Sequence, residues 1–60
     1  MLKEQSIGNC LNEDIVEEIF GSVSEFARQV ELNGNDFAYK NIFVRYDENK
    51  DVHYFFIRVA

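Results

Sequence analysis

The sequence predicts one α+β domain, spanning residues 1–60, in which an amphipathic helix precedes an antiparallel β-hairpin. Apolar residues recur at helical spacing over residues 13–32. Aromatic and β-branched side chains are dense in residues 37–46 and 52–59, on both sides of a polar turn. A chain of 60 residues buries only about 60% of its unfolded surface, so we expect this fold to need further support.

Residues 13–32 have the pattern of a single helix. Asn12 is a favoured N-cap, and Leu11 and Val16 have the spacing of a hydrophobic staple. The Asn-Gly pair at 33–34 supplies a C-cap signal. At about 100° per residue the apolar side chains fall within one arc roughly 140° wide, which excludes every charged residue. The arc contains Ile15, Val16, Ile19, Phe20, Val23, Phe26, Ala27 and Val30.

Gly21 leaves an alternative open. Residues 22–25, Ser-Val-Ser-Glu, match a capping box, which would divide the segment into helices 13–20 and 23–32. The apolar arc nevertheless continues in phase across Gly21, and the glycine falls on the solvent side. One helix, bent at most, is therefore the favoured prediction.

Residues 37–46 and 52–59 are predicted to pair around the polar segment 47–51. If the hairpin is symmetric about Asn49, one apolar face consists of Tyr46 with Val52, Val44 with Tyr54, and Ile42 with Phe56. The opposite face is also apolar and carries Tyr39, Phe43, Phe55 and Ile57.

One helix covers only one face of such a ribbon, and an isolated hairpin is marginally stable. Residues 1–10 can add a short N-terminal strand, although Leu2 and Ile7 are its only large aliphatic side chains. We therefore expect the fold to be completed by that strand or by dimerisation, with the second face meeting another copy or a partner.

Composition argues against most kinds of chemistry. Cys10 and His53 are the only cysteine and histidine, so we expect no disulfide, no zinc site and no cofactor. They are also the only candidates for a thiolate–imidazole pair, and a packed cysteine and a cross-strand histidine explain them more simply. We expect no catalytic residues. The sequence has neither a signal peptide nor a membrane span, which favours a cytoplasmic location.

Charge is distributed unevenly along the chain. The first 36 residues contain eight carboxylates against Lys3 and Arg28, whereas the last 24 are close to neutral. The net charge of the chain is −5. This asymmetry points to a cationic partner and away from direct binding of a nucleic acid, whose phosphates would be repelled.

The acidic helix face is the strongest candidate for a binding site. Its like charges at four-residue spacing repel one another, and no lysine at that spacing relieves them. A solvated face that only keeps the protein soluble is the alternative interpretation. The residues predicted to bind a partner are Glu13, Asp14, Glu17, Glu18 and Glu25.

We therefore expect a small acidic, non-enzymatic protein that engages a basic protein and inhibits a nucleic-acid-binding protein by imitating the charge of its ligand. By analogy of size and charge, such inhibitors are typical of viruses and mobile elements. The alternative function is that of a structural or regulatory subunit, which docks on a larger protein through the aromatic face of its hairpin.

Overall fold

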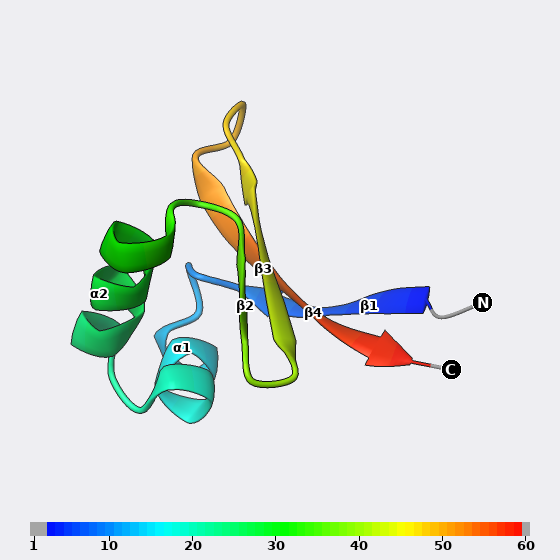
Figure 1. Ribbon diagram of the computed structural model, residues 1–60, viewed down its shortest axis with the longest axis horizontal. Helices are drawn as coiled ribbons and strands as arrows, with labels where there is room; N and C mark the ends of the chain where they lie inside the picture. The colour runs from blue at the N-terminus through cyan, green and yellow to red at the C-terminus, as the bar shows by residue number, and fades with distance from the viewer. Residues whose placement is uncertain (1–2, 60) are drawn as a thin grey trace.

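Two helices pack on one face of a four-stranded antiparallel sheet in the computed structural model, which describes residues 3–59 (Figure 1). This arrangement confirms the α+β class. Neither helix has the length and apolar character needed to cross a bilayer. The sheet order is β1-β4-β3-β2. The elements are β1 (Lys3–Asn9), α1 (Glu13–Phe20), α2 (Val23–Asn33), β2 (Phe37–Tyr39), β3 (Ile42–Asp47) and β4 (Val52–Val59).

The prediction of one continuous helix over residues 13–32 is wrong, and the alternative with a break at Gly21 is correct. Gly21 ends α1 in the left-handed conformation, with φ of 93°, and its N–H donates to the carbonyl of Glu17. The Ser22 hydroxyl then caps α2 by accepting the N–H of Glu25 at 3.0 Å. Val23, which the continuous helix would bury, is 43% exposed.

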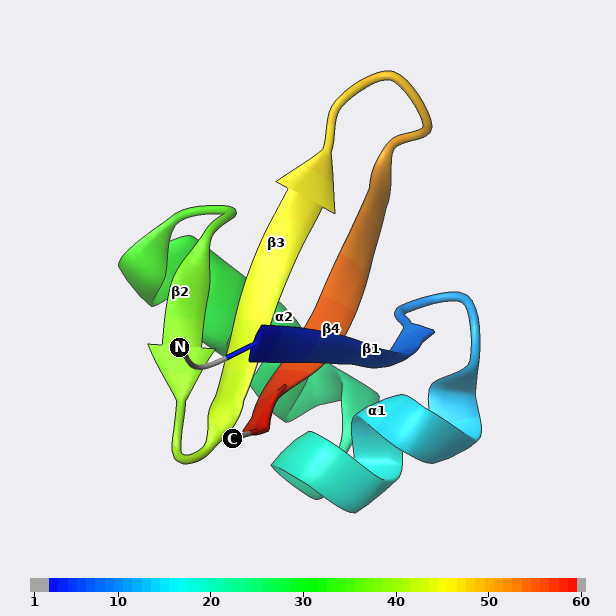
Figure 2. The ribbon, with the colours of Figure 1, turned by 90° about the vertical axis from the view of Figure 1, so that its right-hand side faces the viewer.

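The N-terminal strand forms and pairs with the last strand of the sheet. Lys3 lies opposite Val59, and Asn9 lies opposite Tyr54. The register shifts at the approach to Gly8, which has φ of 153°. The sheet is strongly twisted, so that β1 crosses the direction of β3 (Figure 2). Leu2, named above as part of this strand, lies outside the described residues.

The predicted strand 37–46 is interrupted in the structure. Lys40 and Asn41 form a two-residue turn, and Tyr39 pairs back with Ile42 across it. Lys40 has a positive φ of 56°, which a continuous strand does not allow. Residues 37–46 therefore contribute two antiparallel strands, β2 and β3, in place of one.

The predicted register between β3 and β4 is wrong by one residue. Asp47 pairs with Val52, so four residues separate the strands and the hairpin is not centred on Asn49. Because side chains alternate with a period of two, this shift turns β4 over relative to the prediction. Val44 consequently lies opposite Phe55, and both side chains are completely buried.

The core lies between the helices and this face of the sheet. Its buried members are Val16 and Phe20 of α1 with Val44 and Phe55 of the sheet. Phe20 is central: its ring centroid lies 4.8 Å from that of Tyr39 and 5.8 Å from that of Phe55. Such tilted and edge-on ring pairs add to the stabilisation from apolar burial.

Candidate protein-binding surfaces

Four carboxylates gather on the exposed side of α1, and we call this set the α1 acidic surface. All four side chains are exposed. The two ion pairs found among residues 3–59 involve α2 and the sheet, so no described cation neutralises this surface. The surface consists of Glu13, Asp14, Glu17 and Glu18.

The position of each carboxylate along the helix determines what it does to stability. Asn12 caps α1 by accepting the N–H groups of Asp14 and Ile15 at 3.1 and 3.4 Å. Acidic residues in this first turn interact favourably with the helix dipole. Glu17 and Glu18 lie toward the C-terminal end of the same eight-residue helix, where no basic residue is present and negative charge is unfavourable.

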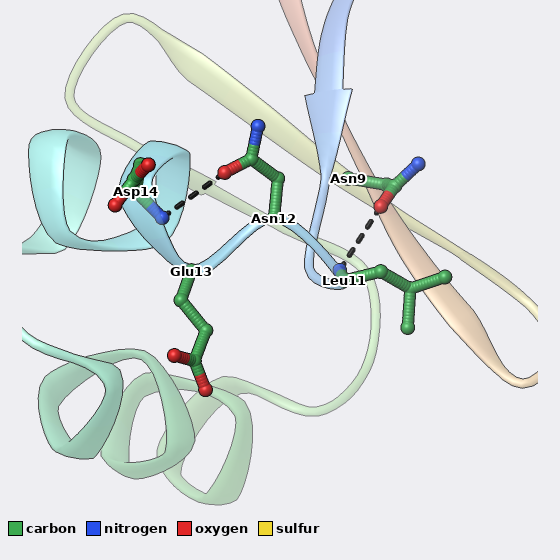
Figure 3. A pocket seen from close by; sticks show the side chains of 5 residues that line it. All are labelled: Asn9, Leu11, Asn12, Glu13 and Asp14. Carbon is green, nitrogen blue, oxygen red and sulfur yellow. Dashed lines mark hydrogen bonds between the residues drawn. The ribbon is translucent and has the colours of Figure 1, made fainter.

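Leu11 is exposed beside the α1 acidic surface. The side-chain oxygen of Asn9 accepts the N–H of Leu11 at 2.9 Å, and this tight turn directs the leucine outward (Figure 3). Leu11 is 74% exposed, whereas Val16 is 1% exposed, so the predicted hydrophobic staple does not form. A shallow depression joins Leu11 to the first turn of the helix, lined by Asn9, Leu11, Asn12, Glu13 and Asp14.

Glu25, the fifth residue predicted to bind a partner, is separated from the other four by the helix break. Its carboxylate accepts hydrogen bonds at 3.0 Å from the side chains of Gln29 and Arg28, both on α2. The hydrogen bond from Gln29 is the main reason that the pKa of Glu25 lies below its ordinary value. Glu25 therefore belongs to a local network on α2 and not to the α1 acidic surface.

The four residues predicted to form a second apolar face do not share one. Phe55 is at the centre of the core, and the ring of Tyr39 packs against Phe20 on the same side of the sheet. Ile57 pairs with Ile42 and so also points to the helix side. Phe43 alone points to the side without helices. The one-residue change in register moves Phe55 and Ile57 to the helix side, and the turn at Lys40 and Asn41 moves Tyr39 there.

The side of the sheet without helices carries a different aromatic set, which we call the open face. Phe43 lies directly opposite Phe56, and both rings are partly buried. The guanidinium carbon of Arg58 lies 4.8 Å from the centroid of Phe43. Arg45 forms an ion pair with Glu4 at 3.1 Å across the sheet. The open face is therefore an aromatic pair flanked by arginines.

Cys10 and His53 come together, but not as a thiol–imidazole pair. The sulfur of Cys10 accepts the backbone N–H of His53 at 3.3 Å. The imidazole Nε2 of His53 instead lies 3.3 Å from the side-chain oxygen of Asn35. Its ring packs edge-on against Phe26, at a centroid distance of 5.3 Å. Both residues therefore have structural partners. The cross-strand neighbour of His53 is Tyr46, at a ring-centroid distance of 4.6 Å, and not Arg45 as the predicted register would require.

The described part of the chain contains no group of three or more histidine, cysteine, aspartate or glutamate side chains arranged to hold a metal ion. Sequence reasoning missed the exposure of Leu11, although Asn9, two residues earlier, is the kind of residue that initiates such a turn. It also missed the pairing of Phe43 with Phe56, which depends on the register. Comparison of the chain with protein-family models, with curated proteins and with solved structures finds no match.

Proposed function

We propose that this chain is a small non-enzymatic binding protein whose α1 acidic surface engages a basic surface on a nucleic-acid-binding protein. It occupies that surface in place of the phosphates of the nucleic acid and so acts as an inhibitor. The observation that carries this proposal is the unfavourable placement of Glu17 and Glu18, which are exposed and toward the C-terminal end of an acidic helix.

Stability alone does not explain these two glutamates. Glu17 follows Glu13 at four-residue spacing, and Glu18 follows Asp14 in the same way, so each pair repels by a few tenths of a kcal/mol. The helix dipole adds a further unfavourable contribution at positions 17 and 18. A charge that opposes folding and faces solvent is well suited to a cationic partner, because binding relieves the repulsion.

Leu11 supports the same surface as an interface. Binding sites concentrate their affinity in a few apolar or aromatic anchors surrounded by polar groups. An exposed leucine next to Glu13 and Asp14 provides this combination. The carboxylates would then set the orientation of the partner and the rate of encounter, while burial of Leu11 would contribute to the affinity.

The test is an affinity capture with the tagged chain, eluted in steps of rising salt and followed by mass spectrometry. We expect a basic, nucleic-acid-binding protein to elute at moderate salt, because exposed charges are screened within about 10 Å at 0.1 M. The variant Glu17→Lys with Glu18→Lys should lose this partner. The control variant Glu31→Lys with Glu48→Lys makes the same change in net charge at exposed sites elsewhere and should retain it.

A second function is favoured by the open face, on which no helix packs and which β1 crosses only in part (Figure 2). Here the chain is a structural or regulatory subunit, and the Phe43–Phe56 pair docks on a larger protein or on a second copy to form a homodimer. A partner held in this way should remain bound through high salt and be lost in Phe43→Ala. Sedimentation of the purified chain at several concentrations tests the homodimer directly.

A further inference from the structure

Residues 3–20, which contain β1 and α1, are joined to the rest of the described chain only through Gly21 and Ser22. We call residues 3–20 the arm and residues 23–59 the body. The arm contacts the body by pairing β1 with β4 and by packing the apolar side of α1 against the core. Figure 1 shows that α1 and α2 run in different directions on either side of the connection. The conformation of two residues therefore decides where the whole arm lies.

The apolar pattern of the two helices is nevertheless that of a single helix. Phe20, Val23 and Ala27 follow one another at spacings of three and four residues, which place them on one side of a continuous helix. Two helices that run in different directions have no need to share this phase. In the structure Val23 is 43% exposed, Ala27 is exposed, and α2 contains no buried residue. A second arrangement with a continuous helix would explain the shared phase.

The connection between the helices can straighten at small cost. Gly21 has a left-handed φ of 93°, and glycine adopts this conformation and the helical one readily. The N–H of Gly21 already donates to the carbonyl of Glu17 at 2.8 Å, which is the spacing of an α-helical hydrogen bond. Straightening loses the hydrogen bond from the N–H of Glu25 to the Ser22 hydroxyl, and a helical hydrogen bond to the Gly21 carbonyl replaces it.

A continuous helix removes the arm from its own body, because α1 cannot extend the axis of α2 and also remain on the core. The edge of β4 that pairs with β1 would then be open, and Val44 and Phe55 would lose the cover of α1. The arm of a second copy fits this place without any change in the contacts, since it is identical to the arm that left. Short hinge connections favour such an exchange.

We propose that two copies of this chain form a dimer by exchanging their arms. Residues 13–33 become one continuous helix in each copy, and each arm packs on the body of the partner copy as it packs here on its own. The contacts between arm and body are kept, and only the connection at Gly21 and Ser22 changes. The exchange itself does not depend on which surface of the protein binds another protein.

Exchange would also extend the α1 acidic surface. At about 100° per residue, Asp14, Glu18 and Glu25 fall within an arc of about 40° on a continuous helix, whereas the break at Gly21 now separates Glu25 from the other two. The dimer presents two such surfaces, so it would bind a target with two basic sites more tightly than the single chain does. This consequence rests on the proposed function.

Sedimentation of the full-length chain at several concentrations tests the exchange without any partner protein. Gly21→Ala disfavours the left-handed connection and favours the continuous helix, and a dimer contains two such connections. The dimerisation constant should therefore tighten by roughly a thousandfold. Ser22→Ala removes the cap of α2 and should tighten the constant by roughly thirtyfold.

Gly34→Ala is the matched control. Gly34 also has a positive φ, of 87°, and no atom lies within 4 Å of the position of its Cβ, as at Gly21. It ends α2 without joining it to another helix, so Gly34→Ala should dimerise no more strongly than the parent chain. A folded Gly21→Ala that behaves like Gly34→Ala would overturn the proposal. If circular dichroism shows that Gly21→Ala is unfolded, Ser22→Ala decides in the same way.

A disulfide distinguishes arm exchange from a dimer that forms through the open face. Glu4 of the arm lies directly opposite Arg58 of the body, so Glu4→Cys with Arg58→Cys can join the two in a Cys10→Ser background. After oxidation and without reductant, the chain that also carries Gly21→Ala should run on a denaturing gel at twice the mass of one chain. The chain that retains Gly21 should run as a single chain. A Gly21→Ala dimer that separates into single chains on this gel would overturn the exchange.

Discussion

Two hydrogen bonds join Cys10 to the backbone of His53. The N–H of Cys10 donates to the His53 carbonyl at 2.9 Å, and the Cys10 sulfur accepts the His53 N–H at 3.3 Å. The pair extends the contact between β1 and β4 by one residue beyond Asn9. It also fixes the point at which the chain leaves the sheet and enters α1. The cysteine is thus part of the fold's framework.

Removing the Cys10 sulfur should destabilise the fold modestly. Cys10→Ala leaves a partly buried N–H without its partner, and we expect a loss of about 1 kcal/mol in the free energy of unfolding. Cys10→Ser retains an acceptor and should lose less. Urea denaturation measures both variants, and equal stability of Cys10→Ala and the parent chain would show that the contact contributes nothing.

Phe20 should be the most sensitive core position. Its ring contacts aromatic residues from α2, β2 and β4, and truncation of such a residue to alanine costs about 3–5 kcal/mol. That is comparable to the whole stability of many small domains, so Phe20→Ala should be largely unfolded by circular dichroism. Leu11→Ala is the control, because its exposed side chain should change stability by no more than about 0.5 kcal/mol. A folded Phe20→Ala would contradict this account of the core.

Local sequence signals predicted which segments form helices and strands, but not how they connect. The helix caps at Asn12 and at 33–34 and the strand 52–59 agree with the structure. At Gly21 the capping box indicated a break between two helices, whereas the uninterrupted apolar arc indicated one helix. Periodicity alone cannot show that the chain changes direction between two helices whose apolar positions stay in phase. The turn at Lys40 was poorly marked, since it contains neither glycine nor proline and Asn41 is its only turn-favouring residue. The burial of Tyr39 against Phe20 supplies the tertiary reason for that turn.

The candidate site was predictable to the extent that it depends on helix faces. The helical spacing of about 100° per residue predicts that the four carboxylates of the α1 acidic surface are exposed, and they are exposed in the structure. The apolar face was not predictable, because its membership depends on a register that the turn sets. Asp51 has a positive φ of 56° in that turn, and this conformation of a non-glycine residue is not readable from sequence.

Gly8 should tolerate substitution poorly. A Cβ at this position would lie 2.5 Å from Cδ1 of Ile15, and the φ of 153° is unfavourable for any side chain. We expect Gly8→Ala to lose more than about 1 kcal/mol, as measured by urea denaturation. Adding Ile15→Val removes the obstructing methyl group and should recover part of the loss. A double variant no more stable than Gly8→Ala would show that backbone strain, not the clash, dominates.

Stability should fall as the pH drops through the titration range of His53. Burial is the main reason that the pKa of His53 lies below its ordinary value of 6.5, and the charges of Asp51 and Asp36 oppose this effect. The unfolded chain therefore binds a proton more readily than the folded chain, and the neutral imidazole stabilises the fold above pH 6.5. That contribution is lost as the pH falls below this value.

Urea denaturation of the parent chain and of His53→Gln measures this effect between pH 7.5 and 5.5. The variant keeps a polar partner for Asn35 but does not titrate, and both chains share the same carboxylates. We expect the parent chain to lose more stability than His53→Gln over this interval. Parallel pH profiles for the two proteins would contradict the assignment to His53.

Glu17→Lys with Glu18→Lys should make the fold more stable while it removes the proposed activity. The substitutions place cations toward the C-terminal end of α1 and opposite Glu13 and Asp14 at four-residue spacing. The gain in the free energy of unfolding should be roughly 1 kcal/mol at low salt, measured by urea denaturation. Because a more stable protein cannot lose its partner by unfolding, loss of capture in this variant would assign the binding to the α1 acidic surface. If the variant is more stable and still captures the same partner, the carboxylates serve solubility, and the open face becomes the site to test next.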